Sequence, residues 1–239
     1  MPQNEKPDFE VCVESAQGLG ACSGLVDRIE LCSALDIGGL TPSAGLMDLA
    51  RESGLETHVL IRPSSGDFEM SATDLKVAIL DIQRARSIGL DGVVIGATKE
   101  GLLDLSALRS LIEAAEDMTL TLHRAFDVVA DQLKALEQAI DLGFHRILTS
   151  GAAKTAPEGT KQLRKLTEQS QSRIEIMAGG GVTAETVNDL IAKTNVHAIH
   201  ASCSARLPLR ADHVEKGFGE FARKTDRKTV ESMLSRVKA

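Results

Sequence analysis

The sequence predicts a single α/β domain folded as a TIM-type (β/α)8 barrel. The chain has 239 residues, and a barrel of this kind uses about 250. Eight β-like runs alternate with helical stretches along the whole chain, and eight is the number of strands that closes such a barrel. A doubly wound open sheet is the rival fold. It usually carries a GxGxxG turn after its first strand, whereas the glycines of "SAQGLGACSG" lack that spacing.

The elements follow from local patterns. The helical stretches carry apolar residues at helical spacing, as in residues 71–89, and several of them end at a glycine suited to a left-handed cap: Gly54, Gly89 and Gly143. Ser, Thr or Pro marks helix starts near residues 41–43, 71, 157 and 183. The predicted strands cover residues 9–14, 28–32, 57–62, 92–96, 120–124, 146–150, 173–179 and 197–202.

We expect one domain over residues 1–239, with an N-terminal tail at 1–8 and a C-terminal extension at 207–239. The extension is polar, and it reads as an arm followed by a terminal helix in "DRKTVESMLSRV". Such an arm fits either the base of the barrel or a neighbouring subunit.

Composition narrows the class of protein. The net charge of −7 and the pI of about 5.4 argue against a nucleic-acid partner. No run approaches the roughly 18 apolar residues of a membrane span, and the polar start lacks the apolar region of a secretory signal. We therefore expect a cytoplasmic protein that does not bind membranes, with its four cysteines present as reduced thiols.

Strand alternation predicts which side chains point into the barrel. Val11 and Val13 face the helices, so their neighbours point inward. Polar groups in a barrel interior are costly unless they pair or contact a ligand, and the C-terminal strand ends carry the chemistry of barrel enzymes. The inward set is Glu10, Cys12, Glu14, Glu30, Cys32, His58, Arg62, Thr121, His123, Glu175, His200 and Ser202.

Two carboxylates on adjacent strands are candidate catalytic groups. Glu10 and Glu30 each stand two residues before a cysteine, and we expect them at the same level, close enough to raise one pKa. Arg62, or Arg28, would neutralise them. The alternative is an interior salt-bridge layer that only stiffens the barrel.

The end of the fifth strand holds His123, Arg124 and Asp127 in "LHRAFD". A histidine with a carboxylate and a guanidinium nearby suits acid–base work on an anionic substrate. A hydrogen-bonded core histidine is the simpler alternative.

The loops after strands six to eight form a predicted anion cradle. Their glycines let main-chain N–H groups approach an oxyanion, and barrel enzymes often bind phosphate after strands seven and eight. The alternative is a set of tight turns that need glycine only for backbone shape. The residues concerned are Ser150, Gly151, Gly180, Gly181 and Ser202.

The cysteines are candidate metal ligands. Cys12 and Cys32 are expected at the same level on neighbouring strands, with Cys203 at the end of the eighth strand, and soft thiolates suit Cu(I). Burial and nearby glutamates would raise the thiol pKa values, which a metal would have to overcome. Buried cysteine also occurs simply as a small apolar residue.

Seven motifs together resemble the CutC family, named copper homeostasis protein, in the right order from Phe9 to Arg206: "FEVCVES", "DRIELCSALDIGGLTPS", "IRPSSGDF", "TLHRAFD", "RILTSGA", "MAGGGV" and "HASCSAR". The resemblance implies a TIM-type barrel and a cytoplasmic homo-oligomer (dimer or tetramer). It also implies copper ligation by Cys12 and Cys32. The family usually has Arg-Gly-Gly-Asp-Phe where this chain has Ser64-Ser65-Gly66-Asp67-Phe68, which removes one anion contact.

Two functions therefore stay open. One is copper binding in metal homeostasis, with Cu(I) held by Cys12 and Cys32. The other is an enzyme acting on a small anionic or phosphorylated substrate. Its acid–base groups would be Glu10, Glu30 and His123, with Arg62 and Arg124 holding charge.

Overall fold

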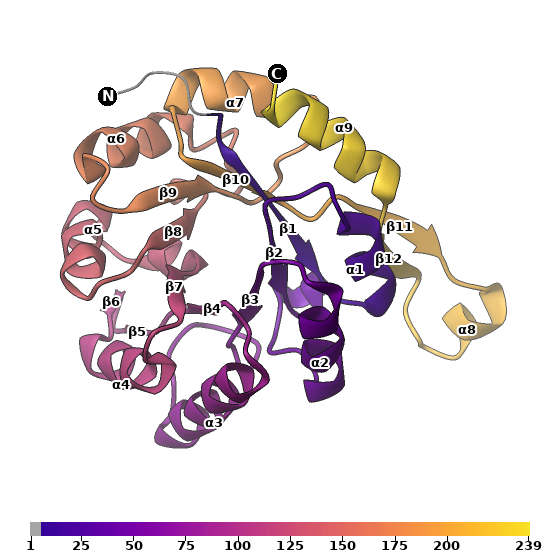
Figure 1. The fold of residues 1–239 in the computed structure, drawn as a ribbon, viewed down its shortest axis with the longest axis horizontal. Coiled ribbons are helices and arrows are strands. Elements are labelled where there is room, and N and C mark those ends of the chain that lie inside the picture. Colours follow the sequence, from indigo (N-terminus) through magenta and orange to yellow (C-terminus); the bar gives the residue numbers. More distant parts are fainter. Residues whose placement is uncertain (1–5) are drawn as a thin grey trace.

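Eight parallel strands close into a barrel in the computed structural model, which describes residues 6–239 (Figure 1). Their order around the barrel is β1-β10-β9-β8-β7-β4-β3-β2. The predicted fold class and its eight strands are confirmed, and residues 1–5 of the predicted tail lie outside the described part. The strands are β1 (Asp8–Val13), β2 (Arg28–Leu31), β3 (Thr57–Leu60), β4 (Gly92–Ile95), β7 (Thr119–Leu122), β8 (Arg146–Thr149), β9 (Glu175–Ala178) and β10 (Ala198–Ala201).

Helices form the outer ring (Figure 1). Ser71 caps the start of one of them with a capping box to Asp74, and Gly89 ends that same helix. Gly54 ends another helix, and both glycines are in the left-handed conformation, as predicted. They are α1 (Ala16–Cys22), α2 (Ala44–Ser53), α3 (Ala72–Ile88), α4 (Leu105–Ala115), α5 (Gln132–Asp141), α6 (Thr160–Ser170) and α7 (Val187–Thr194). Short 3-10 turns, η1 (Leu35–Ile37) and η2 (Arg124–Val128), and a small hairpin of β5 (Thr98–Lys99) and β6 (Leu102–Leu103) lie in the loops.

The start of α7 differs from the expectation at Thr183. The helix begins at Val187, after a turn in which the Thr183 N–H donates to Thr186 Oγ1 at 3.1 Å. A threonine hydroxyl can satisfy a main-chain group without a helix, which is why such residues mark turns as well as caps.

The main apolar core lies between the barrel and the helices. Phe9, Val11 and Val13 are completely buried there, as alternation predicted. A smaller apolar cluster inside the barrel contains Cys12, Cys32, Leu60 and Val94.

The register of β1 and β2 corrects one expectation. Cys12 lies opposite Glu30, and Glu10 lies opposite Arg28. The prediction that Cys12 is level with Cys32, and Glu10 with Glu30, was therefore wrong by two residues. Neighbouring strands of a closed barrel must be staggered, and this stagger shifts the level of residues that occupy equivalent places in their strands.

The C-terminal extension completes the ring and adds an arm. Helix α9 (Arg227–Val237) occupies the eighth helix position, between α7 and α1, with Val230 and Met233 buried (Figure 1). The terminal helix is thus confirmed. The arm is an antiparallel hairpin of β11 (Ser204–Pro208) and β12 (Phe221–Thr225), with α8 (Ala211–Glu215) between them, and it projects from the barrel. An ion pair of 2.7 Å between Arg223 and Asp36 ties its base to η1. Within residues 6–239, no helix is long and apolar enough to span a membrane.

Candidate functional site

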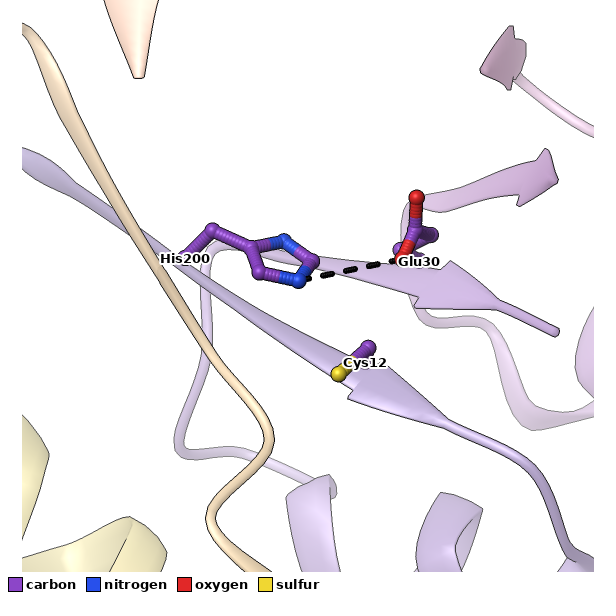
Figure 2. Close-up of side chains that lie close together, drawn as sticks. All are labelled: Cys12, Glu30 and His200. Atoms are coloured by element: carbon purple, nitrogen blue, oxygen red, sulfur yellow. Dashed lines mark ion pairs between the residues drawn. The ribbon is translucent and has the colours of Figure 1, made fainter. Parts of the chain in front are cut away.

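Three side chains from β1, β2 and β10 converge inside the barrel: Cys12, Glu30 and His200 (Figure 2). One ligand atom of each lies within 4.8 Å of the other two, and all three residues are buried. Among residues 6–239 this is the one group of at least three His, Cys, Asp or Glu side chains with such spacing. The barrel brings it together because β1 lies between β2 and β10.

His200 is held from behind by a buried carboxylate. Its Nδ1 lies 2.7 Å from Glu10 Oε1, and its Nε2 lies 3.7 Å from Glu30 Oε2. The other oxygen of Glu10 accepts a hydrogen bond of 2.6 Å from Arg28 Nε. Since the Glu10 carboxylate can only accept, the Nδ1–H of His200 donates a hydrogen bond to it, and Nε2 faces Glu30 and Cys12.

The two glutamates have opposite electrostatic environments. Burial acts to raise the pKa of Glu10, but the hydrogen bond from His200 and the charge of Arg28 outweigh it and hold that pKa well below its usual range. Burial raises the pKa of Glu30 to about 7; His200 opposes this rise and Glu10 adds to it. Glu10 is thus a permanent anion, whereas Glu30 exchanges a proton near neutral pH.

His200 is also perturbed. Burial acts to lower its pKa, but Cys12, Glu10 and Glu30 together raise it well above the usual value. The imidazole is therefore protonated, and a metal ion would have to displace the proton from Nε2 in order to bind there.

The residues fit a metal ion. A tetrahedral ion bound at about 2.0–2.3 Å has its ligand atoms about 3.3–3.8 Å apart, and the separation of His200 Nε2 from Glu30 Oε2 is 3.7 Å. A carboxylate on the far ring nitrogen of a histidine is the usual outer partner in metal sites, and Glu10 occupies that place.

Cys32 lies beside this group but outside it. Its thiol donates to the Val13 carbonyl at 3.5 Å and packs in the apolar cluster with Leu60 and Val94. Burial, followed by Cys12 and Glu30, raises its pKa well above the usual value. In the structure, the potential metal ligands beside Cys12 are the carboxylate of Glu30 and the imidazole of His200. From the sequence, the expected partner of Cys12 was the thiol of Cys32.

Burial also raises the pKa of Cys22 and of Cys203 to about 12, with Cys12 adding to both. These two thiols stay protonated at neutral pH. Of the four cysteines, Cys12 is the one placed among metal-ligating groups of other types within the described residues.

Arg62 forms hydrogen bonds to main-chain carbonyls of the loops at the rim of the barrel. Its guanidinium donates to the main-chain carbonyls of Ile37, Gly39 and Gly66 at 2.8–3.1 Å and lies over the ring of Phe68. The cation that neutralises Glu10 is Arg28, which is 3% exposed. From the sequence, Arg62 was expected in this role and Arg28 was the alternative.

His123 lies apart from the metal-ligating group, with its ring 5.0 Å from that of Phe68. Its Nδ1 accepts a hydrogen bond from the Ala125 N–H, and its buried Nε2 has no hydrogen-bond partner among residues 6–239. Burial, aided by the charge of Arg62, lowers the pKa of His123 to about 3. The imidazole is therefore neutral at physiological pH, with its proton on Nε2, which can donate a hydrogen bond. The acid–base role of His123 stays a prediction.

Asp127 fills the first part of the predicted anion cradle. Its carboxylate accepts from the Ser150 N–H and the Ala152 N–H, each at 3.1 Å. Arg124 donates to Asp127 at 2.7 Å and to the Ser150 hydroxyl at 2.7 Å. Gly151, with a φ of 72°, shapes this loop. The N–H groups expected to hold a ligand anion therefore hold a carboxylate of the chain itself.

Gly180 and Gly181 continue that rim after β9. Both have positive φ, and a Cβ on Gly180 would lie 3.1 Å from a guanidinium nitrogen of Arg124. Ser202 lines a hollow of about 330 Å³ together with Val182, the residue after Gly181, and Lys228. Anion binding at these residues stays a prediction.

The hydrogen bond between Glu10 and His200 was not predicted from the sequence. Alternation placed His200 inside the barrel, but no role was assigned to it. The signal was available, because the first and last strands of a closed barrel are neighbours, and the register pairs Glu10 directly with His200.

The fold and this group define a TIM-type barrel protein with a buried Cys–Glu–His group between its first, second and last barrel strands. Comparison with known proteins narrows the class. The model of the CutC family matches residues 8–205. A family protein CutC of Rhizobium meliloti (strain 1021) is 47% identical over 235 residues, covering 97% of this chain and 96% of the relative. The chain therefore belongs to the CutC family.

Two further relatives agree. A family protein CutC of Agrobacterium fabrum is 50% identical over 199 residues, covering 82% of this chain and 79% of the relative. The crystal structure of the putative copper homeostasis protein CutC from Streptococcus agalactiae is 35% identical, with a TM-score of 0.79, and the match covers 83% of this chain and 99% of that one. The family predicted from the motifs is confirmed.

Proposed function

We propose that the chain binds a copper ion inside the barrel as part of copper homeostasis. The ligands are Cys12 Sγ, His200 Nε2 and a carboxylate oxygen of Glu30. One observation carries the proposal: one ligand atom of each of these three residues lies within 4.8 Å of the other two. The name of the structural relative, copper homeostasis protein, supports copper as the metal.

The surrounding residues prepare the histidine for this role. The carboxylate of Glu10 lies 2.7 Å from Nδ1 of His200, which orients the ring and makes Nε2 a stronger metal ligand. Arg28 balances the charge of Glu10 at 2.6 Å, so that the outer carboxylate adds no net charge to the site. The open alternative is the pair of Cys12 and Cys32 that the family resemblance implies.

An anaerobic competition titration with a chromophoric Cu(I) chelator separates the two ligand sets. Cys12→Ala and His200→Ala should each weaken copper binding at least about 100-fold, because outer-sphere changes alone cost about 10–100-fold. Cys32→Ala should stay within threefold of the parent chain. Cys203→Ala is the matched control, since it removes a buried thiol from outside the group.

If Cys32→Ala weakens binding as much as Cys12→Ala while His200→Ala has no effect, the pair of thiols is the site. If none of the variants changes the affinity, the proposed site is wrong. Far-UV circular dichroism confirms that each variant is folded before titration.

An enzyme acting on a small anionic substrate is the second candidate. It is favoured by the pKa of Glu30 near 7, which suits a general acid–base, and by the unpaired Nε2 of His123. Inorganic phosphate should then shift the amide resonances of Gly180 and Gly181, and Ser202→Ala should weaken that effect. Amide resonances that stay unmoved at saturating phosphate contradict this candidate.

We propose that the chain is a cytoplasmic homo-oligomer, a dimer or a tetramer, as its resemblance to the family implies. Sedimentation equilibrium of the purified chain tests the subunit number, and a purely monomeric chain contradicts it.

A further inference from the structure

The charges around the proposed metal site do not cancel. With a metal bound, the Cys12 thiolate and the Glu30 carboxylate contribute two negative charges, and His200 is neutral. The charge of Glu10 is balanced by Arg28 at 2.6 Å. Arg28 also lies near Asp8 and Glu56, but both are about half exposed and solvent screens them.

From this charge count and the mixed donor set, we infer that the site selects a divalent cation of borderline softness over a monovalent soft cation, with Glu30 as the selecting residue. This inference rests on the proposed metal site and adds the class of ion. It differs from the Cu(I) expected for a pair of thiolates.

Burial makes the charge balance decisive. Cys12, Glu30 and His200 are all at most 8% exposed, and an uncompensated charge in such a place is expensive. A divalent ion neutralises both ligand charges. A monovalent ion either leaves one negative charge buried or leaves the Glu30 carboxyl protonated and out of the coordination sphere.

The donor atoms point the same way. Thiolate, imidazole and carboxylate together form a set typical of Zn²⁺, with three protein ligands and one open position. Monovalent soft ions prefer sulfur and gain little from a carboxylate oxygen. Glu30 is therefore useful to a divalent ion and close to irrelevant to a monovalent one.

Zn²⁺ and Ag⁺ are suitable probes because both are redox-inert under anaerobic conditions. Affinities are measured by chelator competition, with Ag⁺ kept below one equivalent so that only the tightest site fills. Glu30→Gln should lower the Zn²⁺ affinity at least about 100-fold and leave the Ag⁺ affinity within threefold. The matched control is Glu14→Gln, because Glu14 directly follows β1 but accepts a hydrogen bond from the Leu35 N–H and is outside the Cys12–Glu30–His200 group. In this control the Zn²⁺ affinity and the Ag⁺ affinity should both stay within threefold of the parent chain.

Equal losses for Zn²⁺ and Ag⁺ in Glu30→Gln, or no loss for Zn²⁺, overturn the inference. His200→Ala separates this failure from a failure of the proposed site, because His200 belongs to the proposed group and not to the pair of Cys12 and Cys32. If His200→Ala lowers the Zn²⁺ affinity but Glu30→Gln does not discriminate, the site stands and only the selectivity is wrong. If His200→Ala leaves the Zn²⁺ affinity unchanged, the site itself is wrong.

Discussion

Replacing Glu30 by glutamine should stabilise the metal-free protein, by an amount that depends on pH. Glu30 is buried, and its pKa in the folded chain is about 7, against an ordinary value of 4.5. Between these two values the folded chain binds more protons than the unfolded chain. The free energy of unfolding of the parent chain therefore falls as the pH rises through this window. Glutamine has the same shape and never ionises, so the variant escapes this loss.

The magnitude follows from the two pKa values. Their separation corresponds to about 3 kcal/mol when the carboxylate is fully ionised in both states. The advantage of Glu30→Gln over the parent chain should therefore grow from about 0.8 kcal/mol at pH 5 to about 3 kcal/mol at pH 8.5. The protonation of His200 adds its own pH dependence, and much of that is common to both chains.

Urea unfolding followed by circular dichroism, with a chelator present to remove metal, measures this difference. Glu168→Gln is the matched control, because Glu168 pairs with Arg164 on the surface with both side chains more than 60% exposed. It should change the stability by no more than about 0.5 kcal/mol at either pH. If Glu30→Gln shows the same small change at both pH values, Glu30 is not in the buried environment described here.

Three further predictions test other parts of the structure. Arg28→Met removes the cation from a buried carboxylate and should cost about 3–5 kcal/mol of unfolding free energy in urea titrations; a cost below about 1 kcal/mol would show that the pair is not buried. In Gly159→Ala the new Cβ overlaps the main-chain oxygen of Ser150 in the loop after β8, so the unfolding free energy should fall by about 3 kcal/mol or more. In Gly45→Ala the new Cβ meets nothing within 4 Å in α2, so the unfolding free energy should rise by about 0.5 kcal/mol. Equal effects of the two glycine changes on the urea midpoint contradict this. Asp127→Ala removes the acceptor of two main-chain N–H groups in that loop, so their hydrogen exchange should accelerate at least about tenfold; unchanged protection would show that Asp127 does not organise the loop.

The barrel itself was predictable because its strands are short, apolar and regularly spaced. The arm was less so. Residues 204–225 are mostly exposed, including the apolar side chains of Leu207, Val214, Phe218 and Phe221, and such a segment has no burial pattern to distinguish a hairpin from a loop. The start of α7 was misjudged because threonine at 183 suits a turn and a helix cap equally well.

At the site, the sequence identified which side chains point inward but not which ones meet. Alternation placed Cys12, Glu30 and His200 inside the barrel. Their height depends on the stagger between strands, which only barrel closure determines. For this reason Cys12 was paired with Cys32, when its neighbour across the strands is Glu30.

Long polar side chains were the second source of error. Arg62 was expected to neutralise the glutamates, and the loop after β8 was expected to hold a ligand anion. Arg62 instead reaches main-chain carbonyls of the rim, and the carboxylate of Asp127 fills that loop. Main-chain groups in loops are potential partners for any long side chain, and sequence spacing does not reveal them.

X-ray absorption at the zinc edge, on protein loaded with one equivalent of Zn²⁺, tests the metal site most directly. The three proposed ligands predict one sulfur at about 2.3 Å and two or three nitrogen or oxygen atoms at about 2.0–2.1 Å. The sulfur contribution should disappear in Cys12→Ala. Two sulfurs would assign the ion to Cys12 and Cys32 together, and a shell without sulfur would place it elsewhere; either result would contradict a site made by Cys12, Glu30 and His200.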